Sequence, residues 1–115
     1  GLESNGDLQA GVLYEDWNGA NIICHIAAEG NWASNREYMR VIFDYPFGQL
    51  KAKRITVPVA EINFTARKFV ERLGFDLEAM LKDAHPKGAL LIYKMTPDKC
   101  RWLKLKERHG QIIYT

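Results

Sequence analysis

The 115-residue sequence has no long apolar run, few cysteines and little excess charge. No hydrophobic stretch approaches the roughly 20 residues that a bilayer-crossing helix needs, and no charged-then-apolar segment typical of a secretion signal is present. The two cysteines, Cys24 and Cys100, have neither CxxC nor Cys/His ligand spacing, so we expect reduced, buried thiols and no metal. These features predict a cytoplasmic protein made of a single globular domain.

The charge is too mild to indicate a nucleic-acid-binding protein. Net charge is +2 and the sequence pI is about 8.6, whereas nucleic-acid binding requires a concentrated basic face. The three tryptophans, Trp17, Trp32 and Trp102, fall on different predicted elements, which argues against a platform for base stacking. A small polyanionic ligand is compatible with the local basic residues at 51–54 and 67–72.

Two Asn-Gly turns organise the first third of the chain. "SNGD" at 4–7 and "DWNG" at 16–19 hold the residue pair that tolerates the positive φ angles of tight hairpins. Strands are therefore predicted at 8–16 and 20–29. Since only three residues precede the first turn, we expect that an N-terminal segment is missing.

A helix is predicted to start at Ser34, because Glu37 three residues later completes a capping box. Four apolar residues at helical spacing are expected to face the core: Tyr38, Val41, Ile42 and Tyr45. Pro46 should kink or stop this helix.

The stretch "EINFTARKFVERLGF" (61–75) follows a predicted strand at 53–62 that contains Pro58. Because proline cannot donate to a sheet ladder, that strand should lie at an edge, a bulge or a splayed part of the sheet. Asn63 is a candidate helix cap, and Gly74 is the expected C-terminal stop. The predicted core face of this helix comprises Ala66, Phe69, Val70 and Leu73.

Strands at 75–83 and 88–95 and a last helix from Thr96 complete the predicted order. This order predicts an α+β domain over residues 1–115, in which helices pack on a mixed, mainly antiparallel sheet. Residues 104–115 are assigned to a C-terminal tail.

The segment "AEINFTARKFVERLGFDLEAMLKDAHPKGALLIYKM" resembles the C-terminal half of the GCN5-related N-acetyltransferases (GNAT family). The closest branch includes the ribosomal-protein alanine acetyltransferases and short phage-type relatives. The resemblance implies helices on both faces of the sheet and two parallel strands, about 20–28 and 54–61, that splay apart around acetyl-CoA. The missing N-terminal segment would then wall the acceptor site.

The resemblance also implies a set of site residues. The pantetheine arm would bond along the first strand, and the diphosphate would lie at the N-terminus of the helix that follows. Asn63 would cap the second helix and touch the pantetheine arm, and Arg67 would contact a phosphate. The cofactor-binding residues of the first strand and helix would be Ile26, Ala27, Ala28, Trp32, Ala33, Ser34, Asn35 and Arg36.

The sequence departs from the family pattern at two places. The glycine-rich phosphate loop is replaced by "EGNWASNRE", and Val70 stands where many relatives carry a tyrosine that protonates the leaving thiolate. Tyr93 is the candidate substitute for that acid. His25, Glu29 and Glu61 are candidates for the base that takes a proton from the acceptor amine.

The leading hypothesis is an N-acetyltransferase that moves acetyl from acetyl-CoA directly to a primary amine, on a small molecule or a protein N-terminus. The alternative is a non-catalytic protein of this fold that binds CoA or a protein partner. A small nucleic-acid-binding domain is the third and weakest interpretation. No nucleic acid, membrane or metal is expected as a partner, and a homodimer stays open because strand edges are expected to be exposed.

Overall fold

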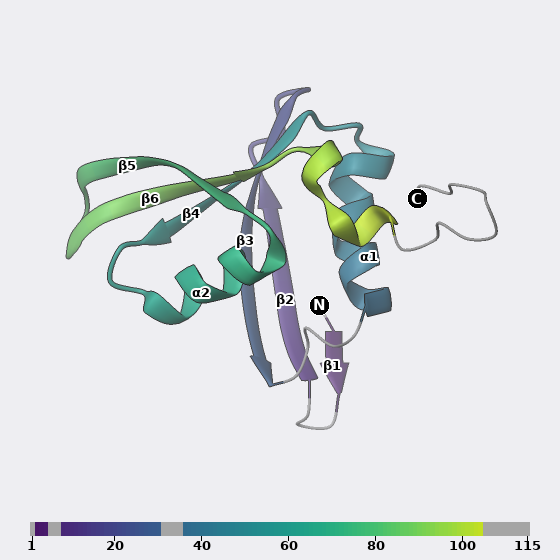
Figure 1. Cartoon of the computed structure of the whole chain (residues 1–115), viewed down its shortest axis with the longest axis horizontal. Helices are drawn as coiled ribbons and strands as arrows, with labels where there is room; N and C mark the ends of the chain where they lie inside the picture. Colours follow the sequence, from purple (N-terminus) through teal and green to yellow (C-terminus); the bar gives the residue numbers. More distant parts are fainter. Residues whose placement is uncertain (1, 5–7, 31–35, 105–115) are drawn as a thin grey trace.

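The computed structural model describes the backbone of residues 2–4, 8–30 and 36–104, and side chains within 12–26 and 39–103. In these ranges one mixed sheet carries two α-helices (Figure 1). The helices are α1 (Arg36–Asp44) and α2 (Phe64–Leu73). The strands are β1 (Leu2–Ser4), β2 (Leu8–Glu15), β3 (Asn21–Gly30), β4 (Arg54–Ala60), β5 (Asp76–His85) and β6 (Gly88–Met95).

The strand order is β1-β2-β3-β4-β6-β5, and every neighbouring pair is antiparallel except β3 with β4. The predicted α+β fold with a mixed, mainly antiparallel sheet is confirmed. No helix in the described ranges combines the length and the apolarity that a membrane crossing requires.

The turn between β2 and β3 forms as its Asn-Gly pair predicts. The Oδ1 atom of Asn18 accepts hydrogen bonds from the backbone N–H groups of Ala20 (2.9 Å) and Asn21 (2.8 Å). Gly19 has a φ of 95°, which a residue with a Cβ rarely adopts. This turn fixes a register in which Leu13 pairs with His25 and Glu15 with Ile23.

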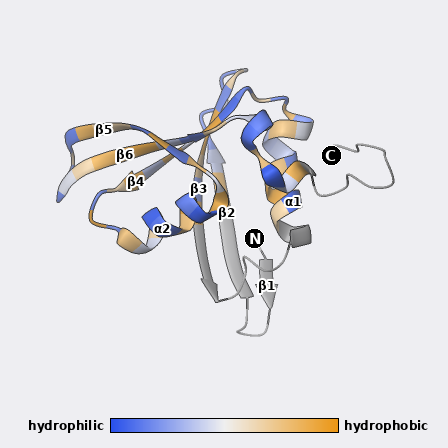
Figure 2. Cartoon of the chain, in the orientation of Figure 1, coloured by the Kyte–Doolittle hydropathy of each residue, from blue (hydrophilic) through white to orange (hydrophobic). Residues whose placement is uncertain are grey.

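One face of the sheet and both helices share a single hydrophobic core. Ile22 pairs with Ile55 across β3 and β4, and Val57 pairs with Tyr93 across β4 and β6, so these buried residues point to one face. Both helices show hydrophilic and hydrophobic residues, as expected for helices with one side on a core (Figure 2). The resemblance implies helices on both faces of the sheet. Among the described residues, both α-helices lie on this one face.

We call the opposite side of the sheet the open face. Side chains alternate between the two faces along each strand, so Leu13, Glu15 and His25 project from it, and all three are exposed. Thr56 and Lys94 project to the same side from β4 and β6. This face is therefore reachable in the described part of the chain.

The predicted core face of α1 is wrong by about one residue. Met39, Ile42 and Phe43 are buried, whereas Val41 is 56% exposed. Tyr45 is also exposed and packs its ring 4.9 Å from that of Tyr14. The side chain of Tyr38 lies outside the described residues. A one-residue error rotates the helix by about 100°, so Val41 moves from the predicted core to solvent.

Pro46 ends α1 as predicted, and a π-helical turn, Tyr45–Gln49, follows. In a continuous helix the carbonyl of Ile42 would accept the N–H of residue 46, which proline lacks. The hydroxyl of Tyr14 donates to that carbonyl instead, at 2.6 Å. A side chain of β2 thus compensates for the proline and ties the sheet to α1.

The predicted features of α2 are confirmed. Val70 and Leu73 are buried, and Ala66 and Phe69 pack against the core. Gly74 has a φ of 110°; its N–H bonds to the Glu71 carbonyl, and that of Phe75 bonds to the Val70 carbonyl. This is the Schellman arrangement that ends many helices.

The predicted C-terminal helix starts after Thr96 with Pro97 at its first position, as expected, but it is not one continuous helix. Two 3₁₀ turns, Pro97–Lys99 and Arg101–Lys104, flank Cys100, which is extended and buried. Trp102 donates from Nε1 to the Leu73 carbonyl at 3.0 Å, and the Arg101 guanidinium donates to the Arg72 carbonyl. Arg72 and Leu73 lie in the last turn of α2, where a helix leaves its carbonyls without intrahelical partners. Arg101 and Trp102 supply those partners.

Candidate functional site

The parallel strands β3 and β4 separate after three residue pairs. Their register runs Asn21–Arg54, Ile22–Ile55 and Ile23–Thr56, and no later pair forms between these described strands, although β3 continues to Gly30 and β4 to Ala60. Beyond these pairs the facing edges are no longer bonded to each other. We call this space the gap, and it is the splayed strand pair that the family resemblance implies.

Whether a residue of β3 is even- or odd-numbered decides whether its backbone N–H and C=O groups point into the gap. We call this alternation the backbone parity. Both backbone polar groups of a strand residue point to one side, and this side alternates along the strand. The Ala20 carbonyl accepts the Arg54 N–H of β4 (3.2 Å), whereas the Asn21 carbonyl accepts the Asn18 N–H of the hairpin (3.2 Å). Even-numbered residues of β3 therefore face β4. Ile26 and Ala28 direct their backbone groups into the gap, and Ala27 directs its own toward β2.

Pro58 lies on the other edge of the gap. The Glu61 N–H bonds to the Ala89 carbonyl of β6 at 3.0 Å, so the odd-numbered residues of β4 are bonded to β6 and the even-numbered ones face β3. Because the β3–β4 ladder ends at Thr56, the missing N–H of Pro58 removes no ladder bond. The splayed position predicted for this proline is thus observed.

Asn63 follows β4 directly and caps α2. Its Oδ1 accepts the Ala66 N–H at 3.1 Å, and its own N–H donates to the Ala60 carbonyl at 2.9 Å. The cap uses the amide oxygen, so the Nδ2 donors are the part of the side chain that the cap does not require. Capping is confirmed; contact with a ligand stays a prediction.

Arg67 is held against the turn that precedes α2. Its Nη1 donates to the Glu61 carbonyl at 3.0 Å, and its guanidinium lies 5.3 Å from the centre of the Phe64 ring. Phe64 itself is 65% exposed. A phosphate contact by Arg67 stays a prediction, and it would require the guanidinium to share or leave the Glu61 carbonyl.

Tyr93 points away from solvent, toward α2. It is fully buried, and its hydroxyl donates to Glu71 Oε2 at 2.6 Å. Burial, followed by this bond to the carboxylate, raises the pKa of Tyr93, and the Arg67 guanidinium acts in the opposite direction. Val70, at the position of the family tyrosine, is also buried. The structure therefore supports a packing role for Tyr93. Val70 has no hydroxyl that could protonate a leaving thiolate.

His25 and Glu15 form a pair on the open face. His25 Nε2 lies 3.0 Å from Glu15 Oε1, and their side chains are 43% and 45% exposed. His25 stands two residues beyond Ile23, the last residue of β3 that pairs with β4. The candidate base is therefore next to the gap, on the exposed open face.

Several predicted site residues cannot be placed. Trp32, Ala33, Ser34 and Asn35 lie outside the described residues, as does the predicted capping box. Arg36 begins α1 and Glu29 lies in β3, but their side chains are not described. Glu61 lies after β4, and its Oε1 accepts the Ala89 N–H at 3.4 Å.

Sequence reasoning missed two polar groupings. The Glu15–His25 pair follows from the register of the "DWNG" hairpin, which could have revealed it. The second grouping crosses the open face: Arg54 bonds bidentately to Glu78 (2.6 and 3.2 Å) and also to Thr56 Oγ1 (3.2 Å). The hydrogen bond from Arg54 lowers the pKa of Glu78. No sequence signal indicates this contact, since it depends on the strand order.

The cysteines are buried thiols, as predicted. Burial raises the pKa of Cys24 to about 12, so its reactive thiolate form is suppressed at neutral pH. Within the described ranges, His, Cys, Asp and Glu do not gather in groups of three or more that could hold a metal ion.

Comparisons with known proteins find similarity in structure but not in sequence. No family model and no curated protein matches the chain. A GNAT-family acetyltransferase from Bacillus anthracis superposes with a TM-score of 0.61 at 14% identity, covering 76% of this chain and 57% of its own. A mutant of a spermidine N-acetyltransferase from Vibrio cholerae gives 0.65 at 19%, covering 84% and 60%.

A ribosomal-protein-S5-alanine acetyltransferase from Vibrio fischeri gives a TM-score of 0.59 at 16% identity, covering 79% of this chain and 55% of its own. The chain thus spans little more than half the length of these solved structures. At such identities the likeness concerns the fold, and the strand order and the splayed parallel pair agree with it. The chain has the fold of the GCN5-related N-acetyltransferases.

Proposed function

We propose that the protein is an N-acetyltransferase that moves acetyl from acetyl-CoA to a primary amine by direct transfer. The observation that carries this proposal is the gap between β3 and β4, whose edges present backbone groups without a partner strand. An extended amide-containing chain such as pantetheine can bond to such an edge as a strand would. The structures that share this fold are acetyltransferases by name, which supports the same chemistry.

The backbone parity of β3 refines the proposed acetyl-CoA site. Ile26 and Ala28 would bond the pantetheine amides, while Ala27 holds β3 to β2. Asn63 would donate from Nδ2 to the same arm, and Arg67 would contact a phosphate. The diphosphate would lie at the start of α1, at residues 32–36, because a helix N-terminus favours anions.

Catalysis would depend mainly on positioning the amine against the thioester and on polarising the thioester carbonyl with gap-facing N–H groups. His25 is the proposed base, and Glu29 is a second candidate. Tyr93 is left out of this proposal as an acid because its hydroxyl is buried and bonded to Glu71. The thiolate would then take its proton from solvent.

The acceptor class is a primary amine. The names of two structural neighbours give spermidine and an alanine of a ribosomal protein as the acceptors of those proteins. Spermidine carries primary amines, and so does an alanine at a protein N-terminus. We therefore propose either a small polyamine or a protein N-terminus as the acceptor. A cytoplasmic location and a homodimer stay predictions.

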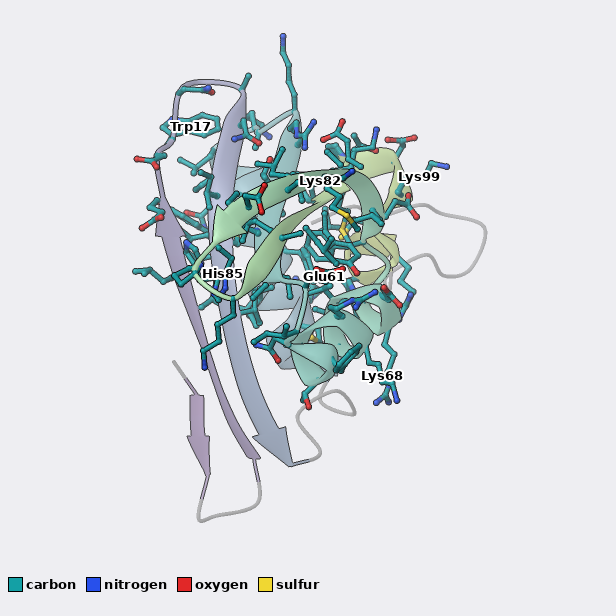
Figure 3. The ribbon with its side chains drawn as sticks, turned by 90° about the vertical axis from the view of Figure 1, so that its left-hand side faces the viewer. Trp17, Glu61, Lys68, Lys82, His85 and Lys99 are labelled. Atoms are coloured by element: carbon teal, nitrogen blue, oxygen red, sulfur yellow. The ribbon has the colours of Figure 1, made fainter. Side chains whose placement is uncertain are left out.

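The second candidate is a non-catalytic protein that binds CoA. Buried Val70 at the family tyrosine position and the burial of Tyr93 favour it. A nucleic-acid-binding domain is not supported: Trp102 is buried, and Trp17 lies at the β2–β3 turn, far from Lys68 on α2 (Figure 3). These residues do not form one basic, aromatic surface.

The proposed function is tested by adding acetyl-CoA and then amines to the purified protein. At 100 times the dissociation constant, acetyl-CoA should stabilise the fold by about 2.7 kcal/mol, measured as a rise in melting temperature. Thiol release should then depend on an added amine, with spermidine and an N-terminal alanine peptide as probes. No stabilisation would reject both candidates, and stabilisation without thiol release would favour the non-catalytic one.

Replacing Asn63 by alanine should weaken CoA binding by more than it weakens the fold. Loss of the cap costs about 1 kcal/mol of unfolding free energy, whereas loss of the Nδ2 contact should also reduce CoA affinity about tenfold. Both are measured on the same protein, by urea denaturation and by calorimetric titration.

Asn18→Ala is the matched control, because Asn18 also bonds backbone N–H groups but at the hairpin turn. It should lower stability and leave CoA affinity unchanged. If Asn63→Ala behaves like this control, Asn63 is a cap only.

A further inference from the structure

We infer that Glu15 is a positioning residue for His25, and that the acceptor amine approaches this pair from the open face. The inference rests on the proposed function and extends it to a residue that the sequence reasoning did not select. It is carried by the 3.0 Å contact between Glu15 Oε1 and His25 Nε2 and by the position of His25 beside the gap.

The two faces of the sheet differ in access. On the helix side, the residues of β3 and β4 that border the gap region, Cys24, Val57 and Val59, are buried in the core. On the open face, His25 and Glu15 are both close to half exposed. An amine can therefore reach the level of His25 from the open face without displacing the core.

The strand geometry places the His25 side chain close to the proposed thioester site. Successive strand residues rise by about 3.3 Å, and His25 immediately precedes Ile26, whose backbone groups point into the gap. His25 thus stands one residue from the edge to which the pantetheine arm would bond. Its side chain leaves the strand toward the open face, where the amine would stand.

Glu15 determines which nitrogen of His25 can act as the base. With Nε2–H donating to the Glu15 carboxylate, the neutral imidazole keeps its lone pair on Nδ1. A carboxylate in this position fixes the orientation of the ring and stabilises the imidazolium that forms. On the same face Arg54 and Lys94 both pair with Glu78. Among the described residues, the ion pair of His25 is with Glu15.

The proposed reaction transfers the acetyl group from sulfur to nitrogen. Nδ1 of His25 takes a proton from the ammonium form of the acceptor, R–NH3⁺, and the neutral amine attacks the thioester carbonyl carbon. A C–N bond forms, the C–S bond breaks, and the nitrogen loses its second proton to solvent water as the amide is produced. The thiolate takes a proton from solvent, and the imidazolium returns its proton to solvent.

The test compares Glu15→Gln, Glu15→Asp and His25→Gln with the parent protein, using acetyl-CoA with spermidine and with an N-terminal alanine peptide. His25→Gln should lower kcat about 10²- to 10⁴-fold and leave stabilisation by acetyl-CoA unchanged. Glu15→Gln should lower kcat about tenfold by disturbing the orientation of the His25 ring, and it should leave the KM for acetyl-CoA and the stabilisation by acetyl-CoA unchanged. Glu15→Asp should restore part of the lost kcat.

His85→Gln is the matched histidine control, since His85 lies at the end of β5 and bonds the Lys87 N–H. It should leave kcat and the KM for acetyl-CoA unchanged. The inference is overturned if either Glu15→Gln or His25→Gln keeps the parental kcat while the parent transfers acetyl. If the parent neither binds acetyl-CoA nor transfers acetyl, the proposed function fails and the inference fails with it.

Discussion

Replacing Phe43 by alanine is expected to lower the unfolding free energy by about 3–5 kcal/mol, which is typical of removing a large aromatic side chain from a core. Phe43 is 1% exposed, and its ring lies 6.1 Å from that of Phe75 and 6.3 Å, stacked, from that of Trp102. It therefore joins α1, the segment after α2 and the C-terminal turns. Since native domains have about 5–15 kcal/mol of unfolding free energy in total, this loss is a substantial fraction of the stability. Equilibrium urea denaturation measures the loss.

Val41→Ala is the control on the same helix. Val41 is 56% exposed, so its truncation should change stability by no more than about 0.5 kcal/mol. The two alanine variants together also test which face of α1 is buried. The sequence pattern predicts Val41 in the core, whereas the structure places Phe43 there. A large loss for Val41→Ala with a small one for Phe43→Ala would contradict the observed packing.

The contrast between α1 and α2 shows when a hydrophobic pattern determines a helix face. In α2 the apolar residues are separated by charged ones, Arg67, Lys68, Glu71 and Arg72, so only one face can be buried. In α1 the run "YMRVIFDYPF" offers apolar residues on most sides. The phase is then decided by tertiary contacts, such as the Tyr14 hydroxyl on the Ile42 carbonyl, which a local pattern does not contain.

In the candidate site, too, some features follow from local sequence and others depend on tertiary contacts. Pro58, Asn63 and Gly74 are predictable because each imposes a local backbone requirement, and all three lie where that requirement is met. The Glu15–His25 pair depends on a cross-strand register and the Tyr93–Glu71 bond on packing between β6 and α2. Contacts between residues distant in sequence need the strand order and register, so sequence reasoning finds the gap but not the partners around it.

The proline substitutions Ala28→Pro and Ala27→Pro should separate ligand binding from strand pairing. Each substitution removes one backbone N–H from β3, and the two positions are adjacent in the strand. By parity the Ala28 N–H points into the gap and the Ala27 N–H points toward Gly11 of β2, its paired residue. Pro58 shows that an edge of this gap accommodates proline within a strand.

Ala28→Pro is therefore expected to keep most of the fold's stability and to lower acetyl-CoA affinity at least tenfold, the equivalent of about 1.4 kcal/mol, because one pantetheine acceptor loses its donor. Ala27→Pro should cost about 1–3 kcal/mol of unfolding free energy through the orphaned β2 carbonyl and should affect affinity much less once the protein is folded. Calorimetric titration at 10 °C, where both variants are mostly folded, measures affinity, and urea denaturation measures stability. Equal affinities for the two variants would show that acetyl-CoA does not bond along this edge of β3, since the orientation of the lost N–H is the principal difference between them.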